Sequence, residues 1–456
     1  VLVHLGCEDA TRSLALHGDG KFLAQALDRD AAKVNAAREL IQSAEKYGAV
    51  SVNVLAGKSL PFADNLINVL VVDDASGLSR DEMLRVVRPL GTVWVAKGRV
   101  EQPGGHGWEK IVKPWPTSLD QWTHFLHDAS GNAVSKDQEI GPPRRVQWTA
   151  GPLWTRSHEF NNSMPAMVTA RGRLFYIFDY GLTGMEDQRL PEKWTLLARD
   201  AFNGSLLWQR DLSTWGSDKW TSRALRFFKG NMARRLVADG DRVFVTYDFG
   251  KGVEILDAAT GKSLGRVPDT EGSEEILVDG NHLICVSQRQ PRRSDAQVVI
   301  TCYDIEAGEN IWQYKGPGHY TPQLPCIGGD AVVYHKAKQL VCLNRADGSE
   351  RWTVAVSQSA GSKVDMLLVA DDSVVVASTK ELKTLSLENG ETNWSVPRKS
   401  NKGSMREYDV FVARGKVFVN STGNLIAGYD LETGEETAEI DPSNVQSQGH
   451  HLRCYR

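Results

Sequence analysis

The chain of 456 residues has no long hydrophobic run, no excess of one charge and no paired cysteines. None of its apolar stretches approaches the roughly 20 residues that a membrane-spanning helix needs, so we expect no membrane span. Its 53 basic and 57 acidic residues give a net charge of −4, which favours neither a nucleic acid nor an anionic membrane as a partner. The length predicts two or three domains.

The six cysteines exclude two common kinds of cofactor site. They form no C-x-x-C, no C-x-x-C-H and no adjacent pair, so their spacing excludes a zinc ribbon and a c-type haem site. The pattern leaves disulfide pairing, and with it the redox compartment, undecided. Because the sequence begins with Val1 and carries no signal peptide, we expect it to be a piece of a longer protein.

The sequence does contain a repeated phrase, in which a small polar residue, usually Asp, precedes a glycine by four positions. An apolar alternating run precedes nearly every copy. This order predicts two strands joined by a tight turn, because glycine adopts positive φ at little cost. The glycines lie 57, 47, 40, 42 and 44 residues apart, a period that predicts a β-propeller of four-stranded blades. The six copies end at Gly204, Gly261, Gly308, Gly348, Gly390 and Gly434.

A tryptophan follows the glycine by four positions in four of these copies. Aromatic residues between strands usually belong to the core, so we expect Trp312, Trp352 and Trp394 to be buried between neighbouring blades. The segment Arg145 to Thr149 is predicted to be a lone strand that closes the ring, since closure removes exposed edges. With six repeats visible, we expect seven or eight blades in the full ring.

Residues 1–98 follow a different pattern, in which strands alternate with helices. The helix at 30–47 has Asp30 well placed as its N-cap. Alternating strands and helices predict a small Rossmann-like α/β domain with a parallel, doubly wound sheet. The expected strands are residues 1–5, 22–27, 50–55, 68–72 and 92–96.

This first segment resembles the class I S-adenosylmethionine-dependent methyltransferases. The resemblance rests on His4-Leu-Gly-Cys-Glu-Asp9 after the first strand, on Leu27-Asp-Arg-Asp30 after the second, and on the stretches at 59–65 and 82–91. It implies that Gly6 and Asp28 bind the cofactor, the first through its backbone and the second through ribose hydroxyls.

The same segment departs from the family at the glycine-rich turn. Glu8 and Ala10 stand where further glycines are expected, so we predict that S-adenosylmethionine binds weakly or not at all. The family's last two strands also have no counterpart before residue 98. The domain is then either a degenerate methyltransferase fold kept as a structural cap or an active methyltransferase.

Residues 99–144 form a joint rich in tryptophan and proline, and residues 145–456 carry the repeats. The repeats resemble the propellers of pyrroloquinoline quinone (PQQ) proteins, which include quinoprotein dehydrogenases and non-enzymatic assembly lipoproteins of the outer membrane. The resemblance covers about residues 145–456 and implies a bacterial protein of the periplasm or the cell exterior. The missing cysteine pair and the lack of an assignable calcium and base constellation predict that PQQ is absent as a working cofactor.

Polar residues outside the repeats form three clusters: in the joint, at the entry to the first blade and at the end of the chain. In a closed ring the first and last blades are neighbours, so we expect these clusters to meet at the propeller mouth. They suit metal ligation, with the metal undecided, or proton transfer on an anionic or sugar substrate. The alternative is that they satisfy one another while sealing the ring. The candidate catalytic residues are His124, His127, Asp128, Arg156, His158, His451 and Arg453.

Two neighbouring candidates, His124 and His127, are three residues apart, and a helical turn would place both on one face.

Three functions follow as hypotheses. The protein binds or acts on a sugar, an alcohol or another small molecule at the propeller mouth, or it is a non-catalytic binding or assembly scaffold, or it is a methyltransferase. An enzyme is expected to be oxidoreductase-like or carbohydrate-active rather than a methyltransferase. The sequence leaves the oligomeric state open.

Overall fold

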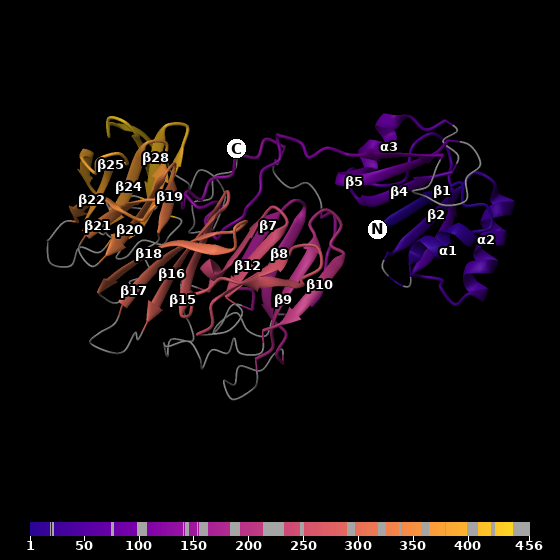
Figure 1. Cartoon of the computed structure of the whole chain (residues 1–456). Coiled ribbons are helices and arrows are strands. Elements are labelled where there is room, and N and C mark those ends of the chain that lie inside the picture. Colours follow the sequence, from indigo (N-terminus) through magenta and orange to yellow (C-terminus); the bar gives the residue numbers. More distant parts are fainter. Residues whose placement is uncertain are drawn as a thin grey trace.

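The structure is a computed structural model of the whole chain, and it combines an α/β domain with a fan of β-sheets (Figure 1). In the part of the chain that it describes, no helix is long and apolar enough to cross a membrane. The described residues are 1–18, 20, 22–73, 77–97, 107–139, 141, 146–152, 154, 163–182, 192–212, 232–246, 250–289, 297–317, 325–336, 339–356, 364–378, 380–398, 409–420 and 425–440.

The α/β domain has three helices and six strands among its described residues. Helix α2 begins where predicted, because the side chain of Asp30 caps it by accepting from the Ala32 amide at 2.8 Å. The elements are β1 (Leu2–Leu5), α1 (Thr11–His17), β2 (Ala24–Asp28), α2 (Ala31–Ser43), β3 (Val50–Val54), β4 (Ile67–Val72), α3 (Arg80–Val86), β5 (Val87–Ala96) and β6 (Trp108–Val112).

These strands form one sheet in the order β3-β2-β1-β4-β5-β6, in which β1 to β5 are parallel. Strand β6 was not expected. It pairs antiparallel with β5, so the sheet continues past residue 98 into the range assigned to the joint. No helix separates β5 from β6 among the described residues, and alternation of strands with helices does not predict an antiparallel edge strand. We therefore propose to end the domain after Val112.

The α/β domain contacts the first blade through the amino-terminal ends of two strands. Asn68, near the start of β4, donates to Asp200 at 2.7 Å, and Arg88, near the start of β5, forms a 2.8 Å ion pair with the same carboxylate. The Asp200 carboxylate is buried, with 1% exposure, while the Arg88 side chain is 18% exposed. The carboxyl-terminal edge of the sheet, with Gly6 and Asp28, lies at the other end of the strands.

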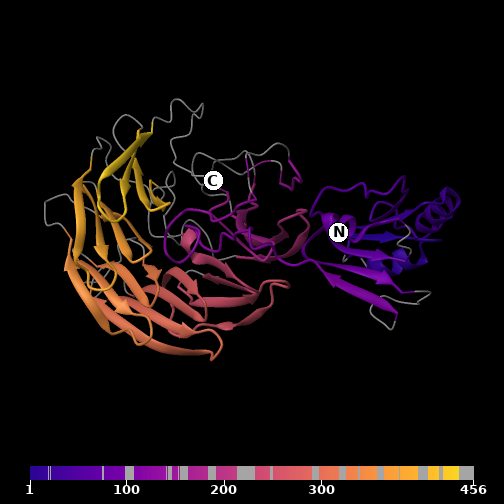
Figure 2. The same ribbon diagram turned by 90° about the horizontal axis from the view of Figure 1, so that it is seen from above.

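Among its described residues, the propeller part contains six four-stranded antiparallel sheets, blades one to six, each built from consecutive strands. Figure 2 shows these sheets as a fan around the joint. Blade one has β7 (Ala166–Ala170), β8 (Arg173–Asp179), β9 (Trp194–Asp200) and β10 (Leu206–Asp211). After η1 (Ala233–Arg235), blade two has β11 (Leu236–Asp239), β12 (Arg242–Thr246), β13 (Val253–Asp257) and β14 (Ser263–Arg266).

The other four blades follow the same plan. Blade three has β15 (Ser273–Asp279), β16 (His282–Arg289), β17 (Gln297–Asp304) and β18 (Glu309–Pro317). Blade four has β19 (Cys326–Gly328), β20 (Ala331–Lys336), β21 (Gln339–Asn344) and β22 (Glu350–Ala355). Blade five has β23 (Val364–Ala370), β24 (Ser373–Ser378), β25 (Glu381–Ser386) and β26 (Thr392–Pro397). Blade six has β27 (Val410–Ala413), β28 (Lys416–Asn420), β29 (Ile426–Asp430) and β30 (Glu436–Ile440).

The repeated phrase forms the turn between the third and fourth strands of each blade. In blade two, Asp257 Oδ1 accepts from the amides of Ala259 and Thr260, and the Gly261 amide donates to the Asp257 carbonyl. Gly261 has φ 69°, a conformation that glycine adopts without a side-chain clash. The predicted strand–turn–strand unit is thus confirmed, and in blades one, two, three and six the aspartate of the phrase accepts from two amides of the turn.

The tryptophans join successive blades, as predicted. Trp312, Trp352 and Trp394 are 9%, 8% and 8% exposed. Each indole lies against the turn glycine of the next blade, and its Nε1–H donates to a carbonyl of that turn. Alternating apolar residues of the sheets fill the space between blades. The five described cysteines, all buried, are free thiols.

Trp148 takes the same position in front of blade one. Its Nε1–H donates to the Ala201 carbonyl at 3.0 Å, and its ring lies against Gly204. The described part of the predicted closing segment, residues 146–149, contains no assigned strand. Its tryptophan nevertheless packs on blade one as Trp312 packs on blade four.

Candidate functional site

Residues 120–139 of the joint, which we call the plug, contact all six blades at the centre of the fan. In every blade, the amide of the next-to-last residue of the innermost strand donates to the plug. The acceptors belong to Trp122, Thr123, His124, Ala129, Ser130 and Asn132, in chain order for blades one to six. The donors are Thr169, Ala238, Val278, Ile327, Val369 and Val412, at distances of 2.7 to 3.0 Å.

This pattern answers a requirement of the fold. The innermost strand of a blade has one unpaired edge, whose amides face the axis of the ring and need acceptors when they are buried. The plug supplies one acceptor to each blade. Asn132 does so with both ends of its amide, because its Oδ1 accepts from the Val412 amide and its Nδ2 donates to the Val412 carbonyl, each at 2.9 Å. The joint is therefore part of the propeller's interior.

His124 serves this packing and has no free ring nitrogen. Its Nε2 accepts from the Val278 amide at 2.9 Å, which requires the proton to be on Nδ1. Nδ1–H therefore donates to Thr123 Oγ1 at 2.7 Å, and that hydroxyl donates to the His127 carbonyl. Burial lowers the pKa of His124 to about 4, so the ring is neutral near pH 7.

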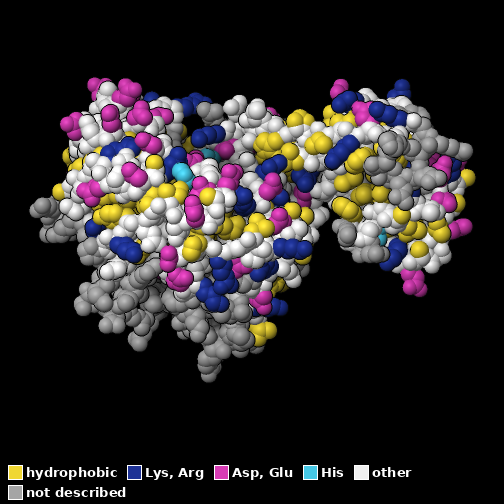
Figure 3. Space-filling model, viewed as in Figure 1, with side chains coloured by type: hydrophobic (Ala, Val, Ile, Leu, Met, Phe, Trp, Pro, Cys, Tyr) yellow, Lys and Arg dark blue, Asp and Glu magenta, His cyan; other side chains and the backbone are white. Residues whose placement is uncertain are grey.

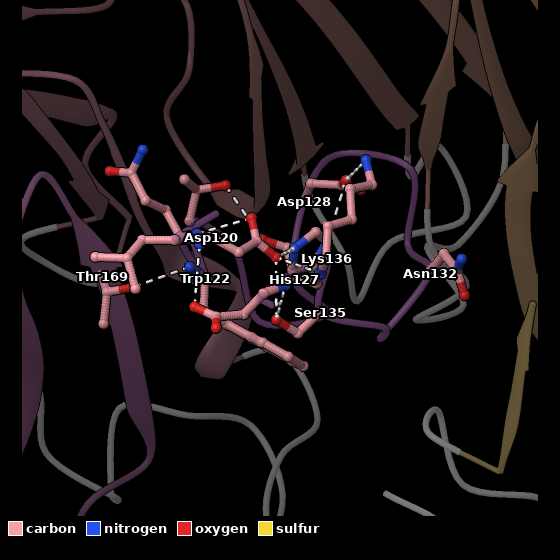
Figure 4. Close-up of polar contacts among 12 residues, drawn as sticks. Asp120, Trp122, His127, Asp128, Asn132, Ser135, Lys136 and Thr169 are labelled. Atoms are coloured by element: carbon pink, nitrogen blue, oxygen red, sulfur yellow. Dashed lines mark hydrogen bonds and ion pairs between the residues drawn. The ribbon is translucent and has the colours of Figure 1, made fainter. Parts of the chain in front are cut away.

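His127 lies between two carboxylates (Figure 4). Its Nε2 is 2.7 Å from Asp120 Oδ2 and its Nδ1 is 3.1 Å from Asp128 Oδ2. Burial alone would lower the pKa of His127, but the charges and hydrogen bonds of Asp128 and Asp120 outweigh it and raise the pKa. With His127 protonated, both nitrogens donate. The ring also contacts the edge of Trp122, with the ring centres 5.3 Å apart.

Both carboxylates have further partners. Burial alone would raise the pKa of Asp128, but bonds from His127 and Ser130 outweigh it and hold that pKa well below its usual range. Asp120 also accepts from the Lys136 amide at 2.6 Å. Lys136 reaches Asp128 with its ammonium at 3.7 Å. The Asp120–His127–Asp128 cluster is thus a closed network that fixes the conformation of the plug, where His127 itself has φ 74°.

Three of the seven candidate catalytic residues lie in this network, and the other four lie outside the described residues. His124, His127 and Asp128 are close together, as expected, but no helical turn joins the histidines. Instead they form an antiparallel bridge in a loop, because the plug follows the blades' edges and makes its hydrogen bonds to them. Whether the first-blade and C-terminal clusters approach this one stays a prediction. The four residues outside are Arg156, His158, His451 and Arg453.

Several residues of the network were not singled out from the sequence. Asp120, Thr123, Ser130 and Asn132 are ordinary polar residues, and only their place outside the repeats distinguishes them. Their partners are up to 280 positions away in the chain, so no local spacing reveals them.

A cavity of about 540 Å³ lies on the outer side of the plug. The plug forms its floor, and its wall consists of the ends of the innermost strands and the following turns of blades two to six. Charged side chains at its surface are Asp128 and Lys136 from the plug and Asp239, Asp279, Asp371 and Arg414 from the blades. On the face shown in Figure 3, acidic and basic side chains are interspersed over the propeller.

Of the residues predicted to bind S-adenosylmethionine, Gly6 has the positive φ of 84° that a glycine-rich turn requires, while Asp28 has other partners in this structure. Asp28 is 7% exposed, and its two carboxylate oxygens accept from the backbone amides of Glu8 and Asp30. Glu8 and Ala10 have φ 48° and 68°, so the loop keeps a backbone suited to glycine while it carries side chains. Ala10 packs into the core, so only the exposed Glu8 side chain is left to obstruct a ligand.

The described residues of the pore also offer no calcium site beside which a quinone would bind. The plug fills the axis at the level of the innermost strand ends and uses the amides that face it. Among the described residues, no group of three or more His, Cys, Asp or Glu side chains is placed to hold a metal ion.

The six four-stranded sheets, their tryptophan contacts and their common axis define a β-propeller. A family described as outer membrane protein assembly factor BamB, of the PQQ-like repeat type, matches residues 192–337 and 297–450, which together span more than half of the chain. The protein belongs to this family. No curated protein sequence matches the chain significantly.

Solved structures are similar to the two parts separately. BamB from Moraxella catarrhalis is 19% identical, with a TM-score of 0.39, over 60% of this chain and 71% of its own. A europium-containing methanol dehydrogenase is 12% identical, with a TM-score of 0.48, over 70% of this chain and 78% of its own. A putative S-adenosyl-L-methionine-dependent methyltransferase from Methanococcus maripaludis is 19% identical, with a TM-score of 0.19, over 21% of this chain and 46% of its own.

Proposed function

We propose that this protein is a non-catalytic binding scaffold, in which the chain itself closes the pore of the propeller. The observation that supports this most is the plug, which donates or accepts a hydrogen bond at every blade. A quinoprotein enzyme needs its pore for the cofactor and substrate. Here the same space holds the protein's own backbone.

The state of the two histidines also supports a scaffold. A catalytic acid or base needs a nitrogen that reaches the substrate. Both nitrogens of His124 are engaged, and so are both nitrogens of His127, which is 3% exposed. These groups rigidify the plug, and a rigid core allows the blade edges and turns to act as a binding platform.

Membership in a family named for outer membrane protein assembly makes a protein the expected partner. The same membership supports a location in the bacterial periplasm or outside the cell. A sugar or alcohol as substrate and a working methyltransferase domain receive less support, because the pore is filled and Asp28 is engaged.

The test compares catalysis with complex formation. After incubation with PQQ and calcium, dye-linked oxidation of alcohols and sugars should not exceed the buffer rate. The intact protein mixed with detergent-solubilised bacterial outer membrane proteins should elute as a discrete larger complex in size-exclusion chromatography. Robust turnover that is lost in Asp128→Asn, without complex formation, would show that the protein is an enzyme. The variant Asp372→Asn, exposed on the turn of blade five, is the matched control.

A further inference from the structure

The cavity on the outer side of the plug has the size and construction of a ligand site. Small-molecule sites commonly measure about 300 to 1,000 Å³, and this one measures about 540 Å³. Its floor is held by bonds to every blade, and its walls are the ends of strands. Such a site changes little when a ligand enters, so binding would cost little ordering entropy.

The charges around the cavity are not evenly matched. The charge of His127 is balanced by Asp120 beneath the surface, and Lys136 lies near Asp128. Asp279 pairs with Arg345 of the next blade. Among the described side chains that line the cavity, two carboxylates, Asp239 and Asp371, then remain with one guanidinium, that of Arg414. The guanidinium of Arg242 lies outside the lining, although its charge acts on Asp239.

The partners of Asp239 are a backbone amide, that of Gly240, and the more distant charge of Arg242. Asp239 is half-buried in the cavity wall, and no described side chain forms an ion pair with it. Burial is the main cause that raises the pKa of Asp239, and the charge of Asp279 adds to it, while the Gly240 amide and the charge of Arg242 oppose the shift without reversing it. A carboxylate in this position is stabilised by any cation that enters the cavity.

We propose that this cavity binds an organic ammonium group, seated against Asp239 and the other carboxylates of the wall. A metal ion is a poor fit, because the described residues hold no cluster of three or more metal-ligating side chains and the cavity far exceeds one ion in size. The ammonium belongs either to a free amine or to a lysine side chain of a partner protein. The inference concerns this cavity alone and does not depend on whether the protein is a scaffold.

Calorimetric titration of the intact protein with three probes of equal length tests the charge preference. 1,5-Diaminopentane should bind saturably to one site, and raised salt should weaken it. 1,5-Pentanediol, which is neutral, and glutarate, which is anionic, should not bind. Equal binding of the diol, binding of glutarate instead, or binding of none of the three would each overturn the proposal.

A pair of variants in one turn then locates the site. Asp239→Asn removes a charge without changing the size of the side chain and should weaken diamine binding by at least about tenfold. Asp241→Asn, whose side chain pairs with Arg171 and Arg173 outside the cavity lining, should bind as the wild type does. Unchanged melting of Asp239→Asn shows that the fold is intact. Equal diamine affinity of the two variants would place the ligand elsewhere and contradict the proposal.

N-acetyl-lysine amide distinguishes the two sources of the ammonium. If it binds as tightly as the diamine, a lysine side chain of a partner is the occupant. If only the diamine binds, the occupant is a free amine. Both results support the ammonium site.

Discussion

The indole of Trp312 lies so close to Gly348 that a Cβ added to the glycine would be 2.5 Å from the ring. The same relationship joins Trp352 to Gly390 and Trp394 to Gly434 in the next blades. The glycine of the repeated phrase therefore has two roles. It adopts the positive φ of the turn, and it leaves room for the tryptophan of the preceding blade.

These two roles can be separated by experiment. Gly308 has φ 75° and Gly348 has φ 71°, but the blade before Gly308 has Gly265 at the tryptophan position. A Cβ on Gly308 meets nothing closer than the Tyr303 hydroxyl at 3.8 Å. Both alanine variants should lose about 1 kcal/mol from the turn conformation, and Gly348→Ala should lose a further 1 to 3 kcal/mol or so from the clash.

Urea denaturation of the two variants measures this difference in the free energy of unfolding. Equal losses would mean that the tryptophan adapts to the added methyl group. In that case the close contact with Trp312 would not explain why position 348 is a glycine.

The repeats made the propeller predictable, because each blade is a local unit. The polar residue, the glycine and the tryptophan that define it lie within nine positions of one another, as from Asn344 to Trp352. Periodicity and turn chemistry can be read from stretches of sequence as short as this. The tryptophan burial followed for the same reason, since each of the four copies that carry the tryptophan repeats the same contact.

The plug was not predictable in the same way. Its bonds reach from Asn132 to Val412 and from His124 to Val278, distances along the chain that no motif spans. A spacing of three between His124 and His127 is typical of a helical face, but the plug instead supplies acceptors to the unpaired amides of six strand edges. Tertiary contacts therefore decided the local conformation.

Asn132 should be among the most sensitive positions of the plug. Replacing it with alanine leaves both the amide and the carbonyl of Val412 without their partner in a half-buried place, and each such group costs about 1 to 3 kcal/mol. We expect a clear loss in the free energy of unfolding, measured by urea denaturation. Asn393→Ala, on the exposed outer strand of blade five, is the matched control and should lose little. Equal stability of the two variants would mean that the plug does not hold blade six.

The buried ring of His124 predicts a loss of stability in mild acid. Its folded pKa of about 4 lies below the ordinary value near 6.5, so the unfolded chain takes up the proton first. The neutral His124 ring therefore adds its full stabilisation to the folded protein above pH 6.5. This stabilisation is lost as the pH falls towards 4, by up to about 3 kcal/mol. Over this window the raised pKa of His127 leaves its own contribution unchanged, and the low pKa values of Asp120 and Asp128 matter only at lower pH.

Denaturation midpoints measured from pH 7 to pH 4 check this slope. His124→Gln should be less stable at pH 7 but should lose most of the dependence on pH. His282→Gln, at the start of β16, serves as the control, and its stability should depend on pH as that of the wild type does. A wild-type curve that stays flat across this range would mean that the His124 ring takes up its proton in the folded protein without cost.

The α/β domain should not bind S-adenosylmethionine at micromolar concentrations. A ribose-binding carboxylate must be free to accept from hydroxyls, whereas Asp28 accepts from the amides of Glu8 and Asp30 and is almost fully buried. Calorimetric titration of the intact chain with S-adenosylmethionine should therefore show no saturable heat. Micromolar binding that disappears in Asp28→Asn but persists in Asp9→Asn, an exposed position of the same loop, would contradict this expectation. It would mean that the loop opens and that the carboxylate exchanges its backbone partners for the cofactor.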